Sequence, residues 1–206
     1  MSNWLIYGIG FFAQILFSAR MIVQWVSSER QKKVVAPSLF WMLSLVASFI
    51  MFIYGYLRSD FAIMFGQSLT YFIYIRNLQL QQQWQKLPIP VRLLLFFVPI
   101  VIVIYYFNNN VIDVDVLFKN EAIPMWLLWL GIISQLVFTF RFVYQWIYSE
   151  RQKTSTLPMG FWLLSLTGSF LILIYAIYRK DPVLFVSHLL GSVIYFRNVI
   201  LIRKST

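Results

Sequence analysis

The chain contains one segment twice, displaced by 121 positions without a gap. The first copy begins at Arg20 and runs through Gln24 to Lys32, and the second begins at Arg141. Between Gly10 and Leu80, about 29 of the 71 residues are identical to the residues 121 positions later. An apolar pattern can recur by chance, but charged and amide residues that recur in register indicate a duplication. The fold must therefore be built from two copies of one unit.

The composition predicts a membrane protein. Hydrophobic residues make up 60% of the chain and charged residues 12%, against roughly 45–50% apolar residues in soluble domains. The first apolar run has no basic residues before it and no cleavage site, so we interpret it as a retained spanning helix and not a signal peptide. The chain has no cysteine, which excludes disulfides and thiol catalysis.

Seven apolar stretches approach the length of about 20 residues that a helix needs to cross a bilayer. They cover residues 4–26, 37–57, 61–80, 91–107, 124–147, 159–178 and 182–202. We therefore predict an all-α polytopic fold with a 3+1+3 arrangement. Its parts are a first three-helix repeat (1–82), a linker helix with an external loop (83–122) and a second three-helix repeat (123–206).

The single middle helix makes the two repeats point the same way across the membrane. Basic residues gather on one side of the predicted spans, which places that side in the cytoplasm. We thus expect a multi-pass protein of the bacterial inner membrane, with the N-terminus outside and the C-terminus in the cytoplasm. The net charge of +10 indicates contact with anionic membrane lipids and requires no nucleic acid.

Four arginines are repeated within or near the predicted spans, and we interpret them as ligands for a substrate phosphate: Arg20, Arg141, Arg76 and Arg197. Arg20 and Arg141 lie about 12 Å inside their helix ends at 1.5 Å per residue, where an ionised group costs several kcal/mol without a partner. A guanidinium binds phosphate through paired hydrogen bonds. The alternative for all four is anchoring at the interface, and it applies most readily to Arg76 and Arg197, which lie nearer the helix ends.

A stripe of polar residues on the third and last predicted helices indicates a pathway for a sugar. The helical spacing puts Gln67, Tyr71, Tyr74 and Asn77 on one face. The second copy has His188, Ser192, Tyr195 and Asn198, and Gln24 and Gln145 add further polar positions. Polar side chains in a span face the protein interior or a wet cavity. The alternative is that they only hydrogen-bond neighbouring helices.

Three further residues have expected roles outside catalysis. Glu29 and Glu150 are expected to be structural partners of nearby basic residues, because loop ends are common places for ion pairs. His188, the one histidine, has no cysteine or carboxylate near it in the sequence for a metal site, so it is expected to hydrogen-bond or to contact substrate. No cofactor, metal or catalytic constellation is predicted, and the chain is expected not to be an enzyme.

The repeated motif resembles the lipid-A-disaccharide synthase N-terminal domain family. The residues that carry the resemblance are Arg20, Gln24-Trp25, Ser28-Glu29, Pro37, Phe40-Trp41, Ser44-Leu45, Tyr54, Arg58, Asp60, Tyr74 and Arg76-Asn77, with their second copies. The layout is more distantly similar to SWEET and PQ-loop transporters. Gln24 and Gln145 fall at the PQ position of those proteins without the proline, and Asn77 and Asn198 match their sugar-contacting asparagines.

The resemblance implies a role in bacterial envelope glycolipid synthesis, including lipid A biosynthesis. Together with the arginines it predicts a transporter or flippase for a phosphate-bearing lipid-linked sugar, such as a polyprenyl-phosphate sugar or a related glycolipid. One alternative is a SWEET-like carrier of a small soluble sugar. Another is a non-catalytic membrane subunit that partners a membrane glycosyltransferase.

Overall fold

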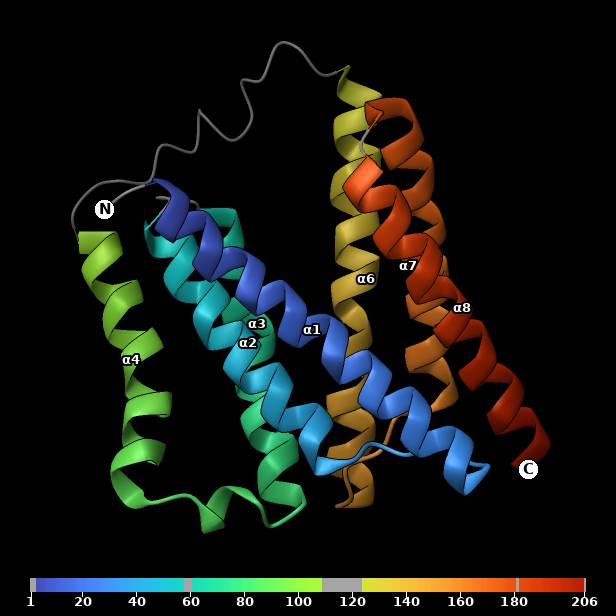
Figure 1. The fold of residues 1–206 in the computed structure, drawn as a ribbon, viewed down its shortest axis with the longest axis horizontal. Coiled ribbons are helices and arrows are strands. Elements are labelled where there is room, and N and C mark those ends of the chain that lie inside the picture. The colour runs from blue at the N-terminus through green and yellow to red at the C-terminus, as the bar shows by residue number, and fades with distance from the viewer. Residues whose placement is uncertain (1–2, 58–60, 109–123, 181, 206) are drawn as a thin grey trace. The chain divides into compact units, whose positions relative to one another are not determined.

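The computed structural model describes residues 3–57, 61–108, 124–180 and 182–205, and within these ranges all regular structure is helical (Figure 1). The helices are α1 (Asn3–Gln31), α2 (Ser38–Leu57), α3 (Phe61–Leu80), the short 3-10 helix η1 (Trp84–Lys86), α4 (Ile89–Asn108), α6 (Met125–Gln152), α7 (Met159–Arg179) and α8 (Pro182–Ser205). The predicted all-helical class is confirmed.

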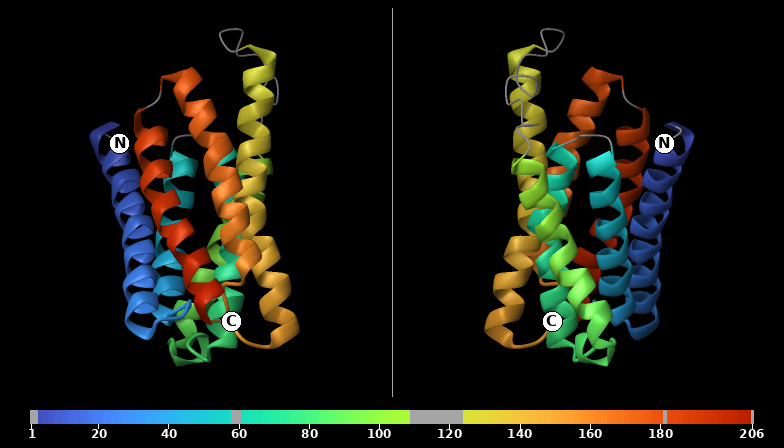
Figure 2. Two further views of the ribbon diagram at one scale, coloured as in Figure 1. Left: turned by 90° about the vertical axis from the view of Figure 1, so that its right-hand side faces the viewer. Right: turned by 90° about the vertical axis from the view of Figure 1, so that its left-hand side faces the viewer.

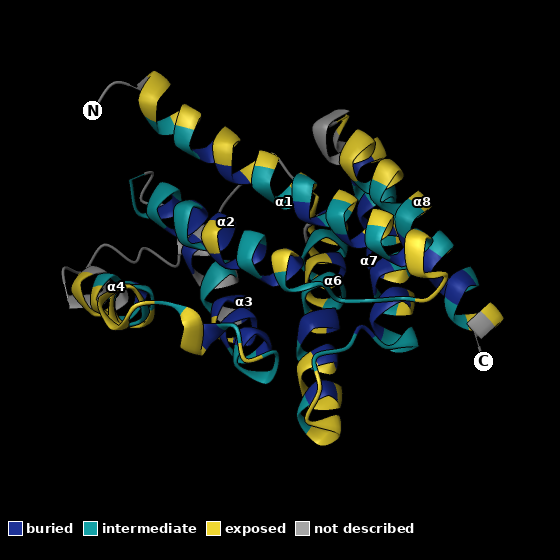
Figure 3. Cartoon of the chain, turned by 60° about the horizontal axis from the view of Figure 1, so that its bottom comes forward, coloured by how far each residue is buried: buried dark blue, intermediate teal, exposed yellow. Residues whose placement is uncertain are grey.

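Five of the described helices are long and apolar enough to cross a membrane, namely α1, α2, α6, α7 and α8. Where its side chains are described, α4 contributes a shorter apolar segment, Ile89–Ile102. Large apolar side chains of these helices are exposed, and Figure 3 shows exposed residues along the outer sides of α1 and α4. This surface fits a membrane protein, because lipid solvates apolar side chains. The 3+1+3 layout stays a prediction.

The helix ends follow from the repeated motif. A proline at position 37 and another at 158 precede α2 and α7, and their carbonyls accept the first-turn N–H of Phe40 and Phe161 at 3.0 Å. Lys32 and Lys153 end α1 and α6 in the left-handed conformation, with φ of 53° and 52°. This conformation lets the chain leave a helix while its last carbonyls remain hydrogen-bonded.

The chain forms two compact units. Unit 1 contains Met1–Val23, Pro37–Phe118 and Lys153–Ser155, and unit 2 contains Gln24–Ala36, Lys119–Gln152 and Thr156–Thr206. The end of α1 and the loop after it thus belong to the unit of the second repeat.

Unit 1 holds the first repeat and α4. The helix α2 packs against α3 and contacts α4, and Ile102 of α4 packs against the buried side chains of Phe52 and Met64. The ring of Tyr54 on α2 lies against Gly10 on α1, where a Cβ would come within 2.9 Å of the ring. The equivalent pair, Gly131 and Tyr175, makes the same contact in unit 2.

Unit 2 holds α6, α7 and α8, with α7 packed against both neighbours (Figures 1 and 2). The closest approach is at Gly168 on α7, where an added Cβ would lie 2.9 Å from the backbone of Phe138 on α6. The first repeat has Ala47 at this position. The second repeat therefore brings two helix backbones together at a contact where glycine leaves the needed room.

The Gly168 contact predicts a difference between two Gly→Ala substitutions. We expect Gly168→Ala to destabilise the protein by about 1–3 kcal/mol, because the methyl group overpacks a contact made with backbone. The control is Gly8→Ala in α1, where nothing lies within 4 Å of the added Cβ; removing the flexibility of glycine there should leave stability unchanged or raise it by roughly 0.5–1 kcal/mol. Thermal unfolding in detergent measures both. Equal unfolding temperatures for the two variants would contradict this account of the contact.

Candidate functional site

Arg20 is buried among the three helices of the first repeat. Only 7% of its surface is exposed. Its Nη1 donates to the hydroxyl of Ser44 on α2 at 2.9 Å and to that of Tyr74 on α3 at 3.2 Å. The guanidinium carbon lies 4.7 Å from the ring centre of Phe17 and 5.4 Å from that of Phe40. Hydroxyl oxygens and aromatic faces thus surround the charge.

Arg141 occupies the equivalent place in the second repeat and is 4% exposed. Its Nη1 donates to the Ser165 hydroxyl at 3.3 Å. Its guanidinium carbon lies 3.6 Å from the ring centre of Phe138, 5.4 Å from that of Phe161 and 5.5 Å from that of Tyr195. Each of these partners is 121 positions from its counterpart around Arg20. The duplication has therefore preserved these contacts of the arginine, although Arg141 also faces the ring of Phe142, where the first repeat has Met21.

The serine in each shell is oriented by the backbone. Ser44 donates its hydroxyl proton to the carbonyl of Phe40 and Ser165 donates to that of Phe161, both at 2.6 Å. Because the hydroxyl proton is used in this hydrogen bond, the serine oxygen can accept from the guanidinium through its lone pairs. Cation–π attraction to the rings adds roughly 2 kcal/mol or more at a desolvated site. These contacts offset part of the cost of burying the charge.

A buried tryptophan packs against the aromatic rings of each shell. Trp41 and Trp162 are completely buried. Each makes an edge-on contact with the preceding phenylalanine, with ring centres 4.7 Å and 4.9 Å apart, and each lies 6.1 Å from the shell tyrosine. The packing fixes the tyrosine and phenylalanine rings that face the arginine.

The predicted amide residues hold the loops that follow α1 and α6. In unit 2, Gln24 and Asn198 exchange two hydrogen bonds, of 2.8 Å and 3.2 Å, and Gln24 also donates to Ser28 at 2.8 Å. Gln145 donates to Ser149 at 2.8 Å and to the carbonyl of Thr156 at 2.9 Å. The side chains of Gln24, Ser28, Asn198, Gln145 and Ser149 are all fully buried.

In unit 1 the corresponding asparagine, Asn77, contacts the loop segment Lys153–Ser155, which follows α6 but belongs to unit 1. The Ser155 hydroxyl donates to Asn77 Oδ1 at 2.7 Å. Asn77 is fully buried, and its amide nitrogen donates to the carbonyl of Ile73 at 2.9 Å. The structure thus gives both repeated asparagines a role in holding loop segments.

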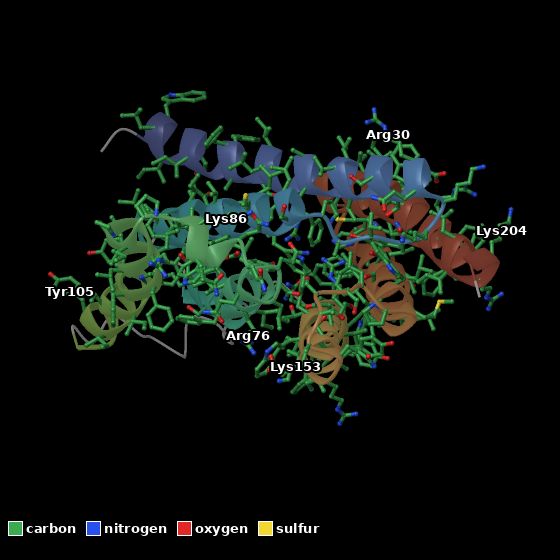
Figure 4. All side chains as sticks on the ribbon, turned by 90° about the horizontal axis from the view of Figure 1, so that it is seen from below. Arg30, Arg76, Lys86, Tyr105, Lys153 and Lys204 are labelled. Atoms are coloured by element: carbon green, nitrogen blue, oxygen red, sulfur yellow. The ribbon has the colours of Figure 1, made fainter. Side chains whose placement is uncertain are left out.

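The remaining predicted arginines have other partners. In unit 2, Arg197 makes a two-point ion pair with Glu29, with distances of 2.5 Å and 2.8 Å, and Trp25 donates to the same carboxylate at 3.2 Å. Arg76 donates to the side chain of Gln79 at 3.1 Å. Glu150 is half-buried. Exposed basic side chains, including Arg30 and Lys204, project from the ends of α1 and α8 (Figure 4).

The first residue of each polar stripe, Gln67 or His188, contacts a serine on α2 or α7. Ser48 donates to the side-chain oxygen of Gln67 at 2.8 Å. In the second repeat, the Ser169 hydroxyl lies 3.1 Å from Nδ1 of His188. Ser192 donates to the backbone carbonyl of His188 at 2.7 Å. No group of three or more potential metal ligands among His, Cys, Asp and Glu occurs in the described part of the chain.

Tyr71 hydrogen-bonds a backbone carbonyl of α4, a partner that its spacing along α3 did not predict. Pro99 lies inside α4 and has no N–H, so the carbonyl of Leu95, four residues earlier, lacks its helical donor. The Tyr71 hydroxyl donates to this carbonyl at 2.7 Å. The second repeat has Ser192 at this position.

The sequence prediction included the arginines and the two shell tyrosines but missed the residues that complete each shell. Those residues are Phe17, Phe40 and Ser44 in the first repeat and Phe138, Phe161 and Ser165 in the second, and the serines that contact Gln67 and His188 were missed as well. All are identical in the two copies. Identity at a spacing of 121 was thus the signal that could have found them.

The Tyr71 contact predicts a coupling between two substitutions. We expect Tyr71→Phe to destabilise the protein by about 1–3 kcal/mol, because it leaves the part-buried carbonyl of Leu95 without a donor. In a Pro99→Ala background, residue 99 can donate to the Leu95 carbonyl, so the same substitution should cost much less. A double-mutant cycle from thermal unfolding measures the coupling. Additive effects of the two substitutions would contradict this explanation.

The family model for the Lipid A Biosynthesis N-terminal domain matches residues 9–79 and 130–200, which are the two repeats. Curated relatives include proteins named lipid-A-disaccharide synthase from Chlamydia felis (32% identical, covering 98% of this chain and 34% of the relative), from Chlamydia pneumoniae (29%, 87% and 30%) and from Chlamydia abortus (31%, 98% and 34%). The chain thus spans about a third of the length of these relatives.

Two expectations change with these comparisons. The expectation that the chain is not an enzyme is contradicted, because its relatives bear the name of an enzyme. The missing motifs were a poor guide, since a chain that matches a third of a longer protein need not show that protein's catalytic residues. No solved structure matches the chain, and its similarity to SWEET and PQ-loop proteins is not shown.

Proposed function

Because the chain belongs to the Lipid A Biosynthesis N-terminal domain family, which gives it a membrane role related to lipid A biosynthesis, we propose that it binds a phosphate-bearing glycolipid and moves it across the membrane. The observation that carries the proposal is the pair of buried arginines, Arg20 and Arg141, each in the same shell. A polyprenyl-phosphate-linked sugar has the required combination of an anionic phosphate, a sugar and an apolar tail.

The shell suits a phosphate that arrives from the membrane. A guanidinium forms charge-assisted hydrogen bonds with phosphate oxygens. Tyr74 and Tyr195 present hydroxyls, which can accept from the arginine and donate to a phosphate. The surrounding rings keep the site poor in water, which strengthens the attraction between opposite charges. Arg197 is a weaker candidate for this role than Arg20, because Glu29 already occupies its planar fork.

We extend the proposal to the placement of the chain in the cell. The exposed lysines and arginines at the ends of α1, α6 and α8 are those expected to face the cytoplasm. The protein would then lie in a bacterial inner membrane with its C-terminus in the cytoplasm, where anionic headgroups attract these side chains.

A flipping assay tests the transport proposal. Proteoliposomes containing a fluorescent polyprenyl-phosphate sugar should show protein-dependent movement of the lipid between leaflets. We expect Arg20→Ala and Arg141→Ala to slow it at least about tenfold, because a hydrogen bond to a charged group contributes about 1.5–3 kcal/mol. Arg20→Lys should also slow it, since the charge remains but the planar fork is lost.

The control is Arg30→Ala, which removes the same charge from an exposed position and should transport at the wild-type rate. Unfolding temperatures establish that each variant is folded. The proposal fails if no flipping depends on the protein, or if folded Arg20 and Arg141 variants transport like the wild type.

The lengths of the relatives favour a second candidate function. Since the chain matches only about a third of proteins named lipid-A-disaccharide synthase, it could work in contact with a membrane glycosyltransferase. Affinity purification from its own host membranes should then recover a glycosyltransferase in stoichiometric amount. Recovery of the chain without such an enzyme, in mild detergent and after crosslinking, would contradict this function.

A further inference from the structure

One polar contact differs in chemistry between two repeats that otherwise match closely. In the first repeat, Ser48 on α2 donates to Gln67 on α3 at 2.8 Å. In the second, Ser169 on α7 keeps its place, but its partner on α8 is Nδ1 of His188, 3.1 Å away. A neutral amide is thus replaced by an imidazole, which can take up a proton near physiological pH.

The imidazole and the arginine of the second repeat pack against the same aromatic ring. The Phe138 ring has the Arg141 guanidinium over its face at 3.6 Å and the His188 ring at its edge, with ring centres 4.9 Å apart. Phe138 is therefore a shared neighbour of Arg141 and His188, both in unit 2.

The groups that face His188 come from three helices. Among the described residues, Arg141 on α6 is the charged group that acts on it electrostatically. Ser169 on α7 supplies a neutral hydroxyl, and Tyr195 on α8 lies 6.3 Å from Phe138. Since Arg141 is cationic, a proton on His188 would place two positive charges near each other. That arrangement becomes favourable when an anion is bound beside them.

We propose that the two repeats are unequal anion sites and that His188 makes binding at Arg141 proton-dependent. This inference rests on the proposed function. A phosphate-bearing ligand at the second repeat would be bound together with a proton, and its affinity would rise as the pH falls. The first repeat, with Gln67 at the equivalent position, binds without this dependence. Proton uptake and anion binding then strengthen each other by the same factor.

Two substitutions exchange the histidine and the glutamine between the repeats. His188→Gln installs the residue that the first repeat already uses, and Ser48–Gln67 shows that a serine hydroxyl can donate to a glutamine at this place. Gln67→His is the reciprocal change, which places an imidazole beside Ser48 in the repeat of Arg20. Both variants keep the guanidinium shells of the two repeats unchanged.

The experiment measures binding to the full chain in detergent at about pH 5 and about pH 8, which lie on either side of the ordinary pKa of histidine, about 6.5. The probes are farnesyl phosphate and farnesyl sulfonate. The sulfonate is needed because a phosphate monoester itself titrates near pH 6, whereas a sulfonate keeps one charge throughout. We expect the wild type to bind the sulfonate roughly fivefold or more tightly at the lower pH.

The two variants test whether His188 is the source of the pH dependence. We expect His188→Gln to abolish the affinity ratio between the two pH values, and Gln67→His to enlarge it. A folded His188→Gln protein that keeps the wild-type ratio overturns this inference alone and leaves the proposed function standing. If neither probe binds at either pH, both the inference and the proposed function are overturned. Thermal unfolding of each variant at both pH values establishes that it is folded.

Discussion

A positive charge buried among apolar helices is the constraint on which each repeat depends. Such a charge costs several kcal/mol unless polar groups and aromatic faces surround it. In each repeat the arginine comes from the first helix, the serine and a phenylalanine from the second, and the tyrosine from the third. Three helices must therefore pack in one register for the charge to be accommodated, which makes the guanidinium shell both a site and a determinant of the fold.

The sequence predicted the helical class and the repeat but not the partners of the polar residues. Helical spacing tells which face a side chain occupies, but the pathway for a sugar that it indicated stays a prediction. It could not tell that Tyr71 serves the carbonyl freed by Pro99, or that Gln24 meets Asn198, because both contacts depend on how helices far apart in sequence pack. The aromatic rings around the arginines were hidden among many apolar residues for the same reason.

The repeated asparagines show how one buried residue can serve two purposes. In Asn77 and Asn198, the amide nitrogen donates to the carbonyl four residues earlier, at 2.9 Å in both cases. This bond fixes the orientation of the side chain, so the amide oxygen is directed away from its own helix. The oxygen then accepts from Ser155 in unit 1 and from Gln24 in unit 2. A structural role is therefore enough to explain why both asparagines are repeated, without a sugar ligand.

The positions at which the copies differ follow from their different surroundings. Tyr71 pairs with α4, which packs against the helices of unit 1, and the second repeat has a serine there, whose hydroxyl bonds within α8. At the position of Ala47 the second repeat has Gly168, where an added Cβ would lie 2.9 Å from the backbone of Phe138. The exchange of Gln67 for His188 keeps the same serine partner in both repeats but changes an amide to an imidazole. A difference that keeps the hydrogen-bond partner but adds a titratable group is the kind expected where the two halves of a duplicated protein have taken on different tasks.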